Sequence, residues 1–169
     1  MVLLLRGVFM YKEEIINYLD KNNIEYDIFN HPPAYTVEDI LSFNLPNKEL
    51  GAKNLFLRDD KKKNYYLVVV QEEKPFNVKN FQEKANTRRL SFASDNDLNK
   101  YLKVTSGAVS PFGILNDDEK MVKVYIDNYF KDKSIWIHPN DNTASILIDI
   151  NDLIKIIEEH GNFVEFIEI

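Results

Sequence analysis

The chain has 169 residues and a formal net charge of −6, with 44% hydrophobic and 12% aromatic residues. This is enough apolar material for the core of one domain. The absence of cysteine excludes disulfides, thiolate zinc sites and a cysteine nucleophile, and is typical of a protein in a reducing cytoplasm. The negative charge argues against extended binding along DNA or another phosphate backbone, because that mode needs many cationic contacts.

The sequence contains no pattern typical of a metal site or a membrane span. His31, His138 and His160 lie far apart without ligand-like spacing, so we expect no metal and no other cofactor. No run approaches the roughly twenty apolar residues that cross a bilayer. We therefore expect a soluble protein with no membrane partner.

The N-terminus carries a short apolar run that is interrupted by Arg6 and lacks a basic lead and a small-residue cleavage site. It does not make a signal peptide. The segment beginning at Met10 reads like a more ordinary protein start. We interpret residues 1–9 as an extension or a misassigned start, and residues 10–169 as the functional domain.

The first predicted elements are a helix, a strand and a short helix. An apolar stripe opposite charged residues predicts a helix over 11–22, and the alternation that follows predicts a strand over 24–29. Thr36 is placed to cap a short helix that ends near Phe43, with Asp39 completing a capping box.

The middle of the chain predicts a hairpin. Apolar runs at 55–57 and 65–70 flank a charged turn, and the second run is continuous enough for a central, buried strand. A helix over 77–85, a strand over 90–93 and a helix over 95–102 follow.

The rest of the chain predicts strands over 122–126, 134–138, 145–148 and 163–169, the last at a sheet edge, and a helix from Asn151 to Gly161. Strands and helices mix without a repeat or regular alternation. This order favours an α+β fold around one mixed sheet.

Small residues and proline follow the 95–102 helix, in the segment Gly107-Ala108-Val109-Ser110-Pro111-Phe112-Gly113. Glycine permits close approach of a ligand and proline fixes the loop, so its N–H groups can face a carbonyl or phosphate oxygen. The alternative interpretation is a tight turn between two elements.

Several basic residues are candidates for local contact with a nucleic acid. They are Arg58, Lys61, Lys62, Lys63, Lys84, Arg88 and Arg89. The alternative is that they are solvated surface charge.

Four segments, in this order and spacing, carry a resemblance to a known family: 31–36, 53–59, the Gly107-x-x-x-Pro111 loop and 137–140. From about Tyr11 to its end the chain resembles the YbaK/ProX family of free-standing editing proteins, which are related to the insertion domain of prolyl-tRNA synthetase. The resemblance implies a single α+β domain with a mixed, mostly antiparallel sheet surrounded by helices. It also implies hydrolysis of the ester that joins a wrong amino acid to tRNA(Pro).

Lys53-Asn54 followed by Leu-Phe-Leu resembles the alanine-removing branch of that family, whereas the cysteine-removing branch usually has threonine after the lysine. The resemblance therefore implies an Ala-tRNA(Pro) deacylase whose partners are the acceptor end of tRNA(Pro) and prolyl-tRNA synthetase. Two alternatives stay open: a Cys-tRNA(Pro) deacylase, and a non-catalytic regulator that binds tRNA or an amino acid.

The resemblance also implies the site residues. The expected catalytic residues are Lys53, Gly107, Ala108 and His138. The expected substrate-binding residues are Asn54, Thr36, Val109, Ser110 and Pro111. An aminoacyl ester is already activated, so positioned water and loop amides that stabilise an oxyanion suffice, with Lys53 at the terminal phosphate or the ester.

Each of these residues also has a structural interpretation. Lys53 could face solvent, Asn54 could brace a turn, Thr36 could be only a helix cap, and His138 could be a structural histidine. Ser110 has no histidine and carboxylate placed to activate it, so a serine-hydrolase triad is rejected.

Overall fold

A computed structural model describes residues 9–169 of the chain. The α-helices are α1 (Lys12–Lys21), α2 (Val37–Ser42), α3 (Val78–Ala85), α4 (Asp95–Asp97) and α5 (Ile150–His160). The strands are β1 (Tyr26–Asn30), β2 (Ala52–Asp59), β3 (Tyr65–Gln71), β4 (Leu90–Phe92), β5 (Val122–Asp127), β6 (Ser134–Ile137), β7 (Ala144–Asp149) and β8 (Val164–Ile167). A π-helical stretch, Leu98–Leu102, continues α4.

The strands form two sheets, of order β1-β7-β6 and β4-β2-β3-β5-β8. Within them β3-β5 and β5-β8 are parallel, and the other four pairs are antiparallel. The α+β class with a mostly antiparallel sheet is therefore confirmed. The expected single sheet is divided: within residues 9–169, the two sheets pair only at one isolated parallel bridge, between Gly51, which precedes β2, and Trp136 of β6.

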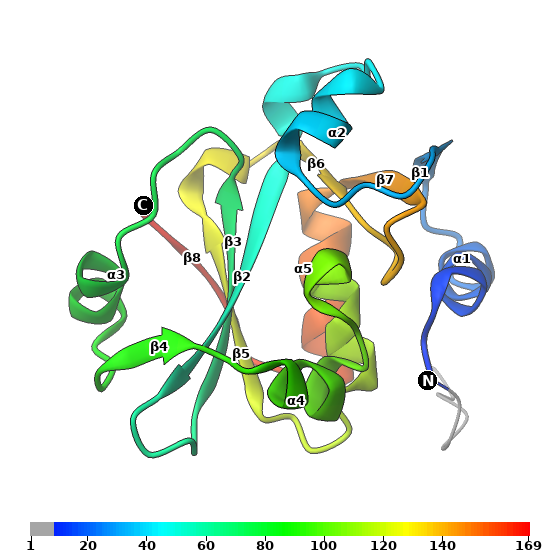
Figure 1. Ribbon diagram of the computed structural model, residues 1–169. Coiled ribbons are helices and arrows are strands. Elements are labelled where there is room, and N and C mark those ends of the chain that lie inside the picture. Colours follow the sequence, from blue (N-terminus) through cyan, green and yellow to red (C-terminus); the bar gives the residue numbers. More distant parts are fainter. Residues whose placement is uncertain (1–8) are drawn as a thin grey trace.

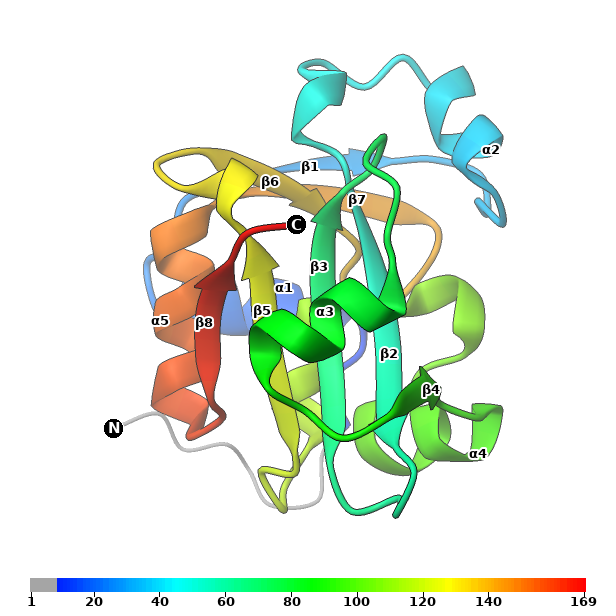
Figure 2. The ribbon, with the colours of Figure 1, turned by 90° about the vertical axis from the view of Figure 1, so that its left-hand side faces the viewer.

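The five-stranded sheet lies in the middle of the molecule (Figure 1). Helix α3 lies across one face, as Figure 2 shows, while α5 and the segments around residues 98–116 cover the other. Every residue of β3 is buried, which confirms the predicted central strand. β8 lies at the edge of this sheet as predicted.

The larger part of the core fills the space between that sheet, α1, α5 and the inner face of the three-stranded sheet. Phe112, Phe130 and Ile135 are among its fully buried side chains. A smaller apolar cluster around Phe81 packs α3 on the opposite face. β2 and β3 thus contribute alternate side chains to two cores.

The start of α2 follows the predicted capping box. The Thr36 hydroxyl accepts the N–H of Asp39 at 3.1 Å, and the Asp39 carboxylate accepts the N–H of Thr36 at 3.0 Å. At the other end of the chain, Gly161 terminates α5 with φ of 103°. Glycine adopts this left-handed conformation without the steric cost that other residues pay.

Short 3-10 helices are the elements that the sequence did not indicate. They are Lys48–Leu50, Ser106–Ala108, Pro111–Asn116 and Asn128–Phe130. The Pro111–Asn116 helix is buried throughout, so the segment after Gly107 is a packed element as well as a loop. Runs this short have no clear 3.6-residue periodicity.

The chain enters the core at Met10, near the start of the described residues. Met10 is 6% exposed, and its carbonyl accepts the side-chain N–H groups of Asn140 at 2.7 Å and Asn116 at 3.3 Å. The proposed extension, residues 1–9, lies outside the described residues except for Phe9. Within residues 9–169, none of the helices has the length and apolar character that a membrane span requires.

Candidate functional site

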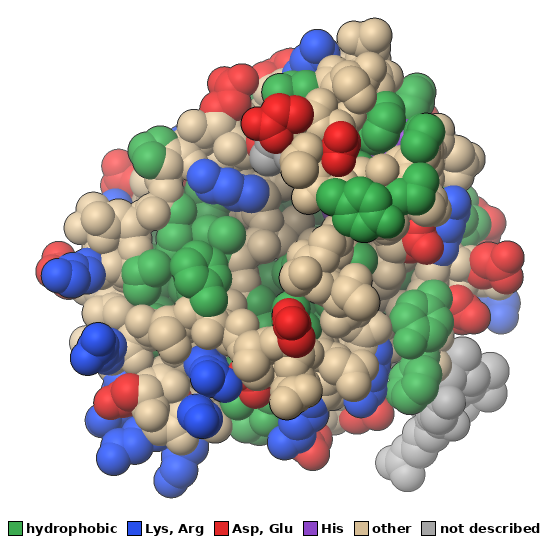
Figure 3. Space-filling model, in the orientation of Figure 1, with side chains coloured by type: hydrophobic (Ala, Val, Ile, Leu, Met, Phe, Trp, Pro, Cys, Tyr) green, Lys and Arg blue, Asp and Glu red, His purple; other side chains and the backbone are tan. Residues whose placement is uncertain are grey.

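A small pocket lies where the two sheets meet. Its walls come from the start of β2, the residue that follows β3, the end of β6, one residue of β7, and the segment that contains α2. The lining residues are Ile40, Leu41, Leu45, Lys48, Gly51, Ala52, Asn54, Glu72, Trp136, Ile137, His138 and Ser145. The cavity volume is about 50 Å³. The face of the molecule in Figure 3 is hollowed near its middle, below α2.

The indole of Trp136 fixes the position of the segment after α2, which forms one wall of this pocket. Its N–H donates to the carbonyl of Pro46 at 2.8 Å, which ties the segment after α2 to β6. Leu45, beside that proline, is 6% exposed. The pocket therefore has an apolar wall with a fixed position.

Asn54 supplies the pocket with a free acceptor. It lies on the face of β2 that carries Ala52 and Phe56, toward the larger core. Its side-chain oxygen is buried and accepts no hydrogen bond from any residue in the range 9–169. A buried carbonyl oxygen without a partner is costly, so this atom is suited to accept a donor from a ligand.

Glu72 is a pocket residue that the sequence analysis missed. It follows β3, and its N–H donates to the carbonyl of Gly51 at 3.0 Å. Burial raises the pKa of its carboxyl, Glu73 adds to that effect, and Lys53 opposes it. The sequence signal was an acidic residue directly after a fully buried strand.

Gly51 allows the Glu72 carboxylate to lie against the backbone. A Cβ at this position would lie 2.5 Å from Oε2 of Glu72 and 3.1 Å from the Lys48 carbonyl oxygen. A larger residue would therefore push the carboxylate aside and crowd the Lys48 carbonyl. The absence of a side chain at Gly51 thus gives the Glu72 carboxyl its place in the pocket wall.

Lys53 lies on the opposite face of β2 from Asn54. It shares that face with Leu55 and Leu57, which pack in the smaller core on the α3 side. Its ammonium donates to the carbonyl of Lys74. The structure thus does not place Lys53 among the lining residues, but it places it close enough to Glu72 to lower the pKa of that carboxyl.

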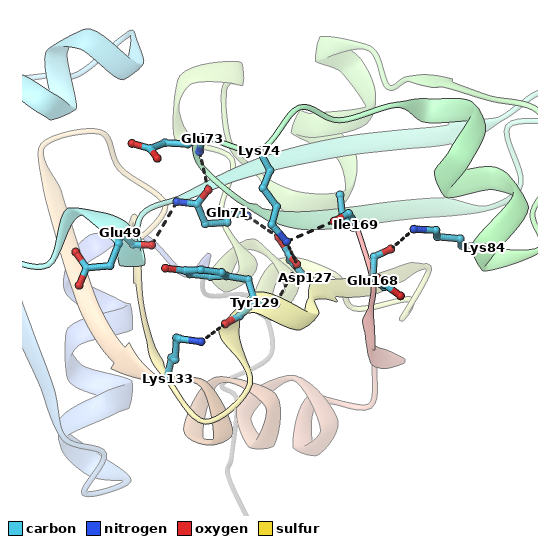
Figure 4. Close-up of polar contacts among 10 residues, drawn as sticks. All are labelled: Glu49, Gln71, Glu73, Lys74, Lys84, Asp127, Tyr129, Lys133, Glu168 and Ile169. Atoms are coloured by element: carbon cyan, nitrogen blue, oxygen red, sulfur yellow. Dashed lines mark hydrogen bonds and ion pairs between the residues drawn. The ribbon is translucent and has the colours of Figure 1, made fainter.

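The buried carboxylate of Asp127 fixes the turn that contains Lys74, whose carbonyl accepts the ammonium of Lys53. Figure 4 shows the contacts of Asp127 and Lys74. Asp127 is 0% exposed and pairs with the ammonium of Lys74 at 2.9 Å. The same carboxylate accepts the N–H of Gln71 at 3.1 Å and that of Tyr129 at 3.0 Å. The end of β3, the Lys74 turn and the end of β5 are therefore joined at one group.

His138 reaches the pocket from the end of β6. Its Nδ1 donates to the carbonyl of Ala144 at 2.9 Å, which leaves Nε2 as the acceptor of the neutral ring. Burial lowers the pKa of His138, and the nearby ring of His31 adds to that effect. His138 is therefore neutral near pH 7.

A second histidine supports the pocket from β1. His31 is buried; its Nδ1 donates to the carbonyl of Pro32 at 2.8 Å, and its Nε2 accepts the hydroxyl of Ser145 at 3.0 Å. Its ring stacks on Phe43 with centroids 4.7 Å apart. His31 orients Ser145, which lines the pocket.

The glycine and proline loop is attached to the pocket through Ser110. The buried Ser110 hydroxyl donates to the carbonyl of His138 and accepts the N–H of Phe112 at 3.2 Å. The N–H of Ala108 donates to Thr105 at 3.0 Å. The N–H groups of Gly107 and Val109 donate to no protein group within the described residues.

The structure brings Asn54 and His138 together in the pocket and joins the Gly107–Pro111 loop to His138. Pro111 is buried at the first position of a 3-10 helix. Thr36 caps α2 and is not among the lining residues. In the part of the chain that the structure describes, no three His, Asp or Glu side chains gather as metal ligands.

Comparisons with known proteins assign the family. The family model described as "Aminoacyl-tRNA editing domain" matches residues 31–156. The prolyl-tRNA editing protein ProX of Acetoanaerobium sticklandii is 42% identical over 159 residues, covering 94% of this chain and 97% of that protein. The chain belongs to the aminoacyl-tRNA editing domain family, and its resemblance to the YbaK/ProX proteins is confirmed.

More distant relatives agree in length and fold. Prolyl-tRNA synthetase associated domain-containing protein 1 of Mus musculus is 28% identical over 82% of this chain and 85% of that protein. A crystal structure of a candidate trans-editing enzyme for prolyl tRNA synthetase has a TM-score of 0.70 at 13% identity, and covers 94% of this chain and 96% of its own. At that identity the structural match supports the fold.

Loss of the Asp127 carboxylate tests the turn that holds Lys53. We expect Asp127→Asn to lower the free energy of unfolding by about 2 kcal/mol, because a buried charge-assisted contact is lost. Asp60→Asn is the matched control, since Asp60 pairs with Arg88 on the exposed surface. That variant should change stability by less than about 0.5 kcal/mol. Urea denaturation measures both, and equal effects would contradict the assignment.

The ring of His138 should titrate below its ordinary pKa of 6.5. The unfolded chain then binds a proton more readily than the folded one, so stability falls as the pH drops below about 6.5. NMR titration of the ring, assigned by comparison with His138→Gln, gives the midpoint. The variant should also lose less stability between pH 7 and pH 5, and a midpoint above 6.5 would show that the ring is not desolvated.

Proposed function

We propose that the chain is an aminoacyl-tRNA deacylase that hydrolyses the ester of mischarged Ala-tRNA(Pro), an editing reaction in trans. Membership of the editing family, the 42% identity to a prolyl-tRNA editing protein and the Lys53-Asn54 pair support this proposal. The observation that carries it is the unpartnered carbonyl oxygen of Asn54 in a small pocket beside Glu72.

The α-ammonium group of the amino acid donates to Asn54 and is neutralised by Glu72. A cation that enters this pocket gives the buried oxygen its missing hydrogen bond and the half-buried carboxylate its counter-charge. Both groups are acceptors, and both line the same cavity. The pocket is thus suited to the positively charged end of an aminoacyl ester.

Pocket size favours alanine over proline. A cavity of about 50 Å³ has room for a methyl side chain against Trp136 and Ile137. The proline ring is larger, and its nitrogen has one fewer N–H to donate. Steric exclusion of a larger residue is more effective than rejection of a smaller one, which gains only about 1 to 3 kcal/mol per methylene.

Water is the nucleophile in this proposal. Its oxygen bonds to the carbonyl carbon, and the developing oxyanion accepts the free N–H groups of Gly107 and Val109. The bond from carbon to the ribose oxygen then breaks, and the water proton ends on that ribose oxygen. His138, neutral at Nε2, orients the water or the ribose hydroxyl, and Lys53 stabilises the terminal phosphate.

The proposal also assigns a place and a partner. Residues 10–169 form the editing domain, and the substrate is produced wherever prolyl-tRNA synthetase charges tRNA(Pro). The protein therefore acts in the cytoplasm, on the acceptor end of that tRNA.

Deacylation assays test the proposal. Purified protein should release alanine from Ala-tRNA(Pro) and leave Pro-tRNA(Pro) intact, with Cys-tRNA(Pro) as the comparison that decides between branches. Lys53→Ala should lower kcat/KM roughly tenfold, because the terminal phosphate loses a charge-assisted contact worth about 1.5 kcal/mol. Lys21→Ala, at an exposed lysine on α1, is the control. An alanyl ester that survives catalytic amounts of enzyme would refute the proposal.

Gly107→Ala separates folding from substrate approach. A Cβ at Gly107 would meet no atom within 4 Å, so the variant should unfold at the same urea concentration as the parent. We expect kcat/KM for Ala-tRNA(Pro) to fall at least about tenfold, because the methyl group displaces the ester carbonyl from the loop amides. Ser106→Ala, on the same exposed turn, should retain activity. Full activity in Gly107→Ala would exclude this loop from the oxyanion site.

A further inference from the structure

Five cationic side chains gather at one end of the five-stranded sheet, and we name them the basic turn patch. They are Lys61, Lys62, Lys63, Arg88 and Arg89, all exposed. The first three form the turn between β2 and β3, and the two arginines precede β4. The N–H of Asp60 donates to the carbonyl of Arg89 at 2.9 Å, which holds the two segments together.

Most of this charge is uncompensated. Arg88 pairs with Asp60 at 2.6 Å, but the three lysines and Arg89 make no ion pair within residues 9–169. Two other candidate cations are already engaged: Arg58 pairs with Asp97 at 2.6 Å, and Lys84 donates to the carbonyl of Glu168 at 2.9 Å. The patch is therefore a local positive region on a chain of net charge −6.

The turn that carries the lysines has a defined shape. The Asp59 carboxylate accepts the N–H of Lys63 at 2.9 Å and the side chain of Asn64 at 2.7 Å. Asp59 is 2% exposed, so its contacts are shielded from solvent. A fixed turn loses less conformational entropy when its lysines bind a partner than a flexible one would.

The patch and the pocket open on the same face of the molecule. Figure 3 shows Lys and Arg side chains gathered at the lower left, below and beside the central hollow. Strand β2 connects the two sites, with Asn54 near one end and Lys61 beyond the other. At about 3.3 Å per residue, Asn54 and Asp59, the last residue of the strand, are about 17 Å apart, and Lys61 follows in the turn.

An exposed aromatic side chain lies next to the patch. Phe92, in edge strand β4, is 60% exposed. Cationic groups beside an exposed aromatic ring are typical of surfaces that bind single-stranded nucleic acid, where phosphates meet the cations and bases stack on the ring. A partner of this chemistry fits the patch better than an apolar protein surface does.

We propose that the basic turn patch binds the phosphate backbone of the tRNA acceptor stem while the esterified 3′ end occupies the pocket. This inference rests on the proposed function. A tRNA ends in a short single-stranded segment, so its first paired nucleotides lie some distance from the ester, as the patch does from Asn54. The contact recognises backbone charge and carries no base specificity.

A triple substitution tests the patch. The variant K61Q/K62Q/K63Q is compared with K21Q/K131Q/K155Q, which removes the same charge from exposed lysines of other elements. Two substrates are used: Ala-tRNA(Pro), and an alanyl ester of the trinucleotide CCA, which lacks the stem. For the patch variant, KM for Ala-tRNA(Pro) should rise roughly tenfold. The slope of log KM against log salt concentration should become shallower by about one unit per substituted lysine. Its kcat and its activity on the trinucleotide ester should not change.

The outcomes are distinct. Equal KM values for the two triple variants would overturn the inference. So would a patch variant that loses activity only when prolyl-tRNA synthetase is present, because the patch would then bind protein. If the parent protein hydrolyses neither substrate, the proposed function fails, and fluorescence anisotropy with uncharged tRNA(Pro) still tests the patch. Unchanged affinity in K61Q/K62Q/K63Q would then reject it.

Discussion

The pocket depends on the single parallel bridge between Gly51 and Trp136, where the two sheets meet. The two sheets pair no further there, and the pocket beside this contact is lined by residues of β2, β6 and β7. Glycine on one side of that contact leaves room for the Glu72 carboxylate, which a Cβ there would push aside. Trp136 lies on the other side, and its indole N–H donates to the carbonyl of Pro46, which fixes the wall that follows α2.

The distribution of charge explains how an acidic protein could handle a nucleic acid. The pocket has acceptors in its wall, Asn54 and Glu72, which suit an ammonium group. Apart from Lys48, an exposed residue that also lines the pocket, the cations named above lie elsewhere, with Lys53 on the opposite face of β2 and the basic turn patch at the far end of that strand. Net charge averages over these regions, whereas binding depends on the local potential. A substrate that is cationic at one end and polyanionic along the rest matches this arrangement.

The sequence predicted the elements whose side chains are periodic or whose caps are local. The apolar stripe of α1, the Thr36 capping box and the end of α5 at Gly161 were all readable, because each signal lies within a few residues. The division into two sheets was not, since one bridge between distant segments decides it. Glu72 was missed for the same reason: its place in the pocket depends on how β3 ends against Gly51.

The candidate site residues also divide into those that the sequence indicates and those whose contacts only the structure shows. Motif spacing indicated His138, which lines the pocket, and the Gly107 loop, whereas their connection through the Ser110 hydroxyl needed coordinates. The Lys53-Asn54 pair was indicated as a motif, and strand alternation sends its two side chains to opposite faces. Which of the two faces the pocket could be assigned only once the two cores were known.

The opposite orientation of Lys53 and Asn54 gives the pairing of β2 with β3 a chemical meaning. The ladder runs from Ala52 opposite Gln71 to Arg58 opposite Tyr65. A slip by one residue would turn every β2 side chain to the other side of the sheet. An ammonium would then enter the cavity where a carboxamide now lies, and a cationic guest would be repelled. The register of β2 against β3 thus determines whether the pocket can accept a cationic group.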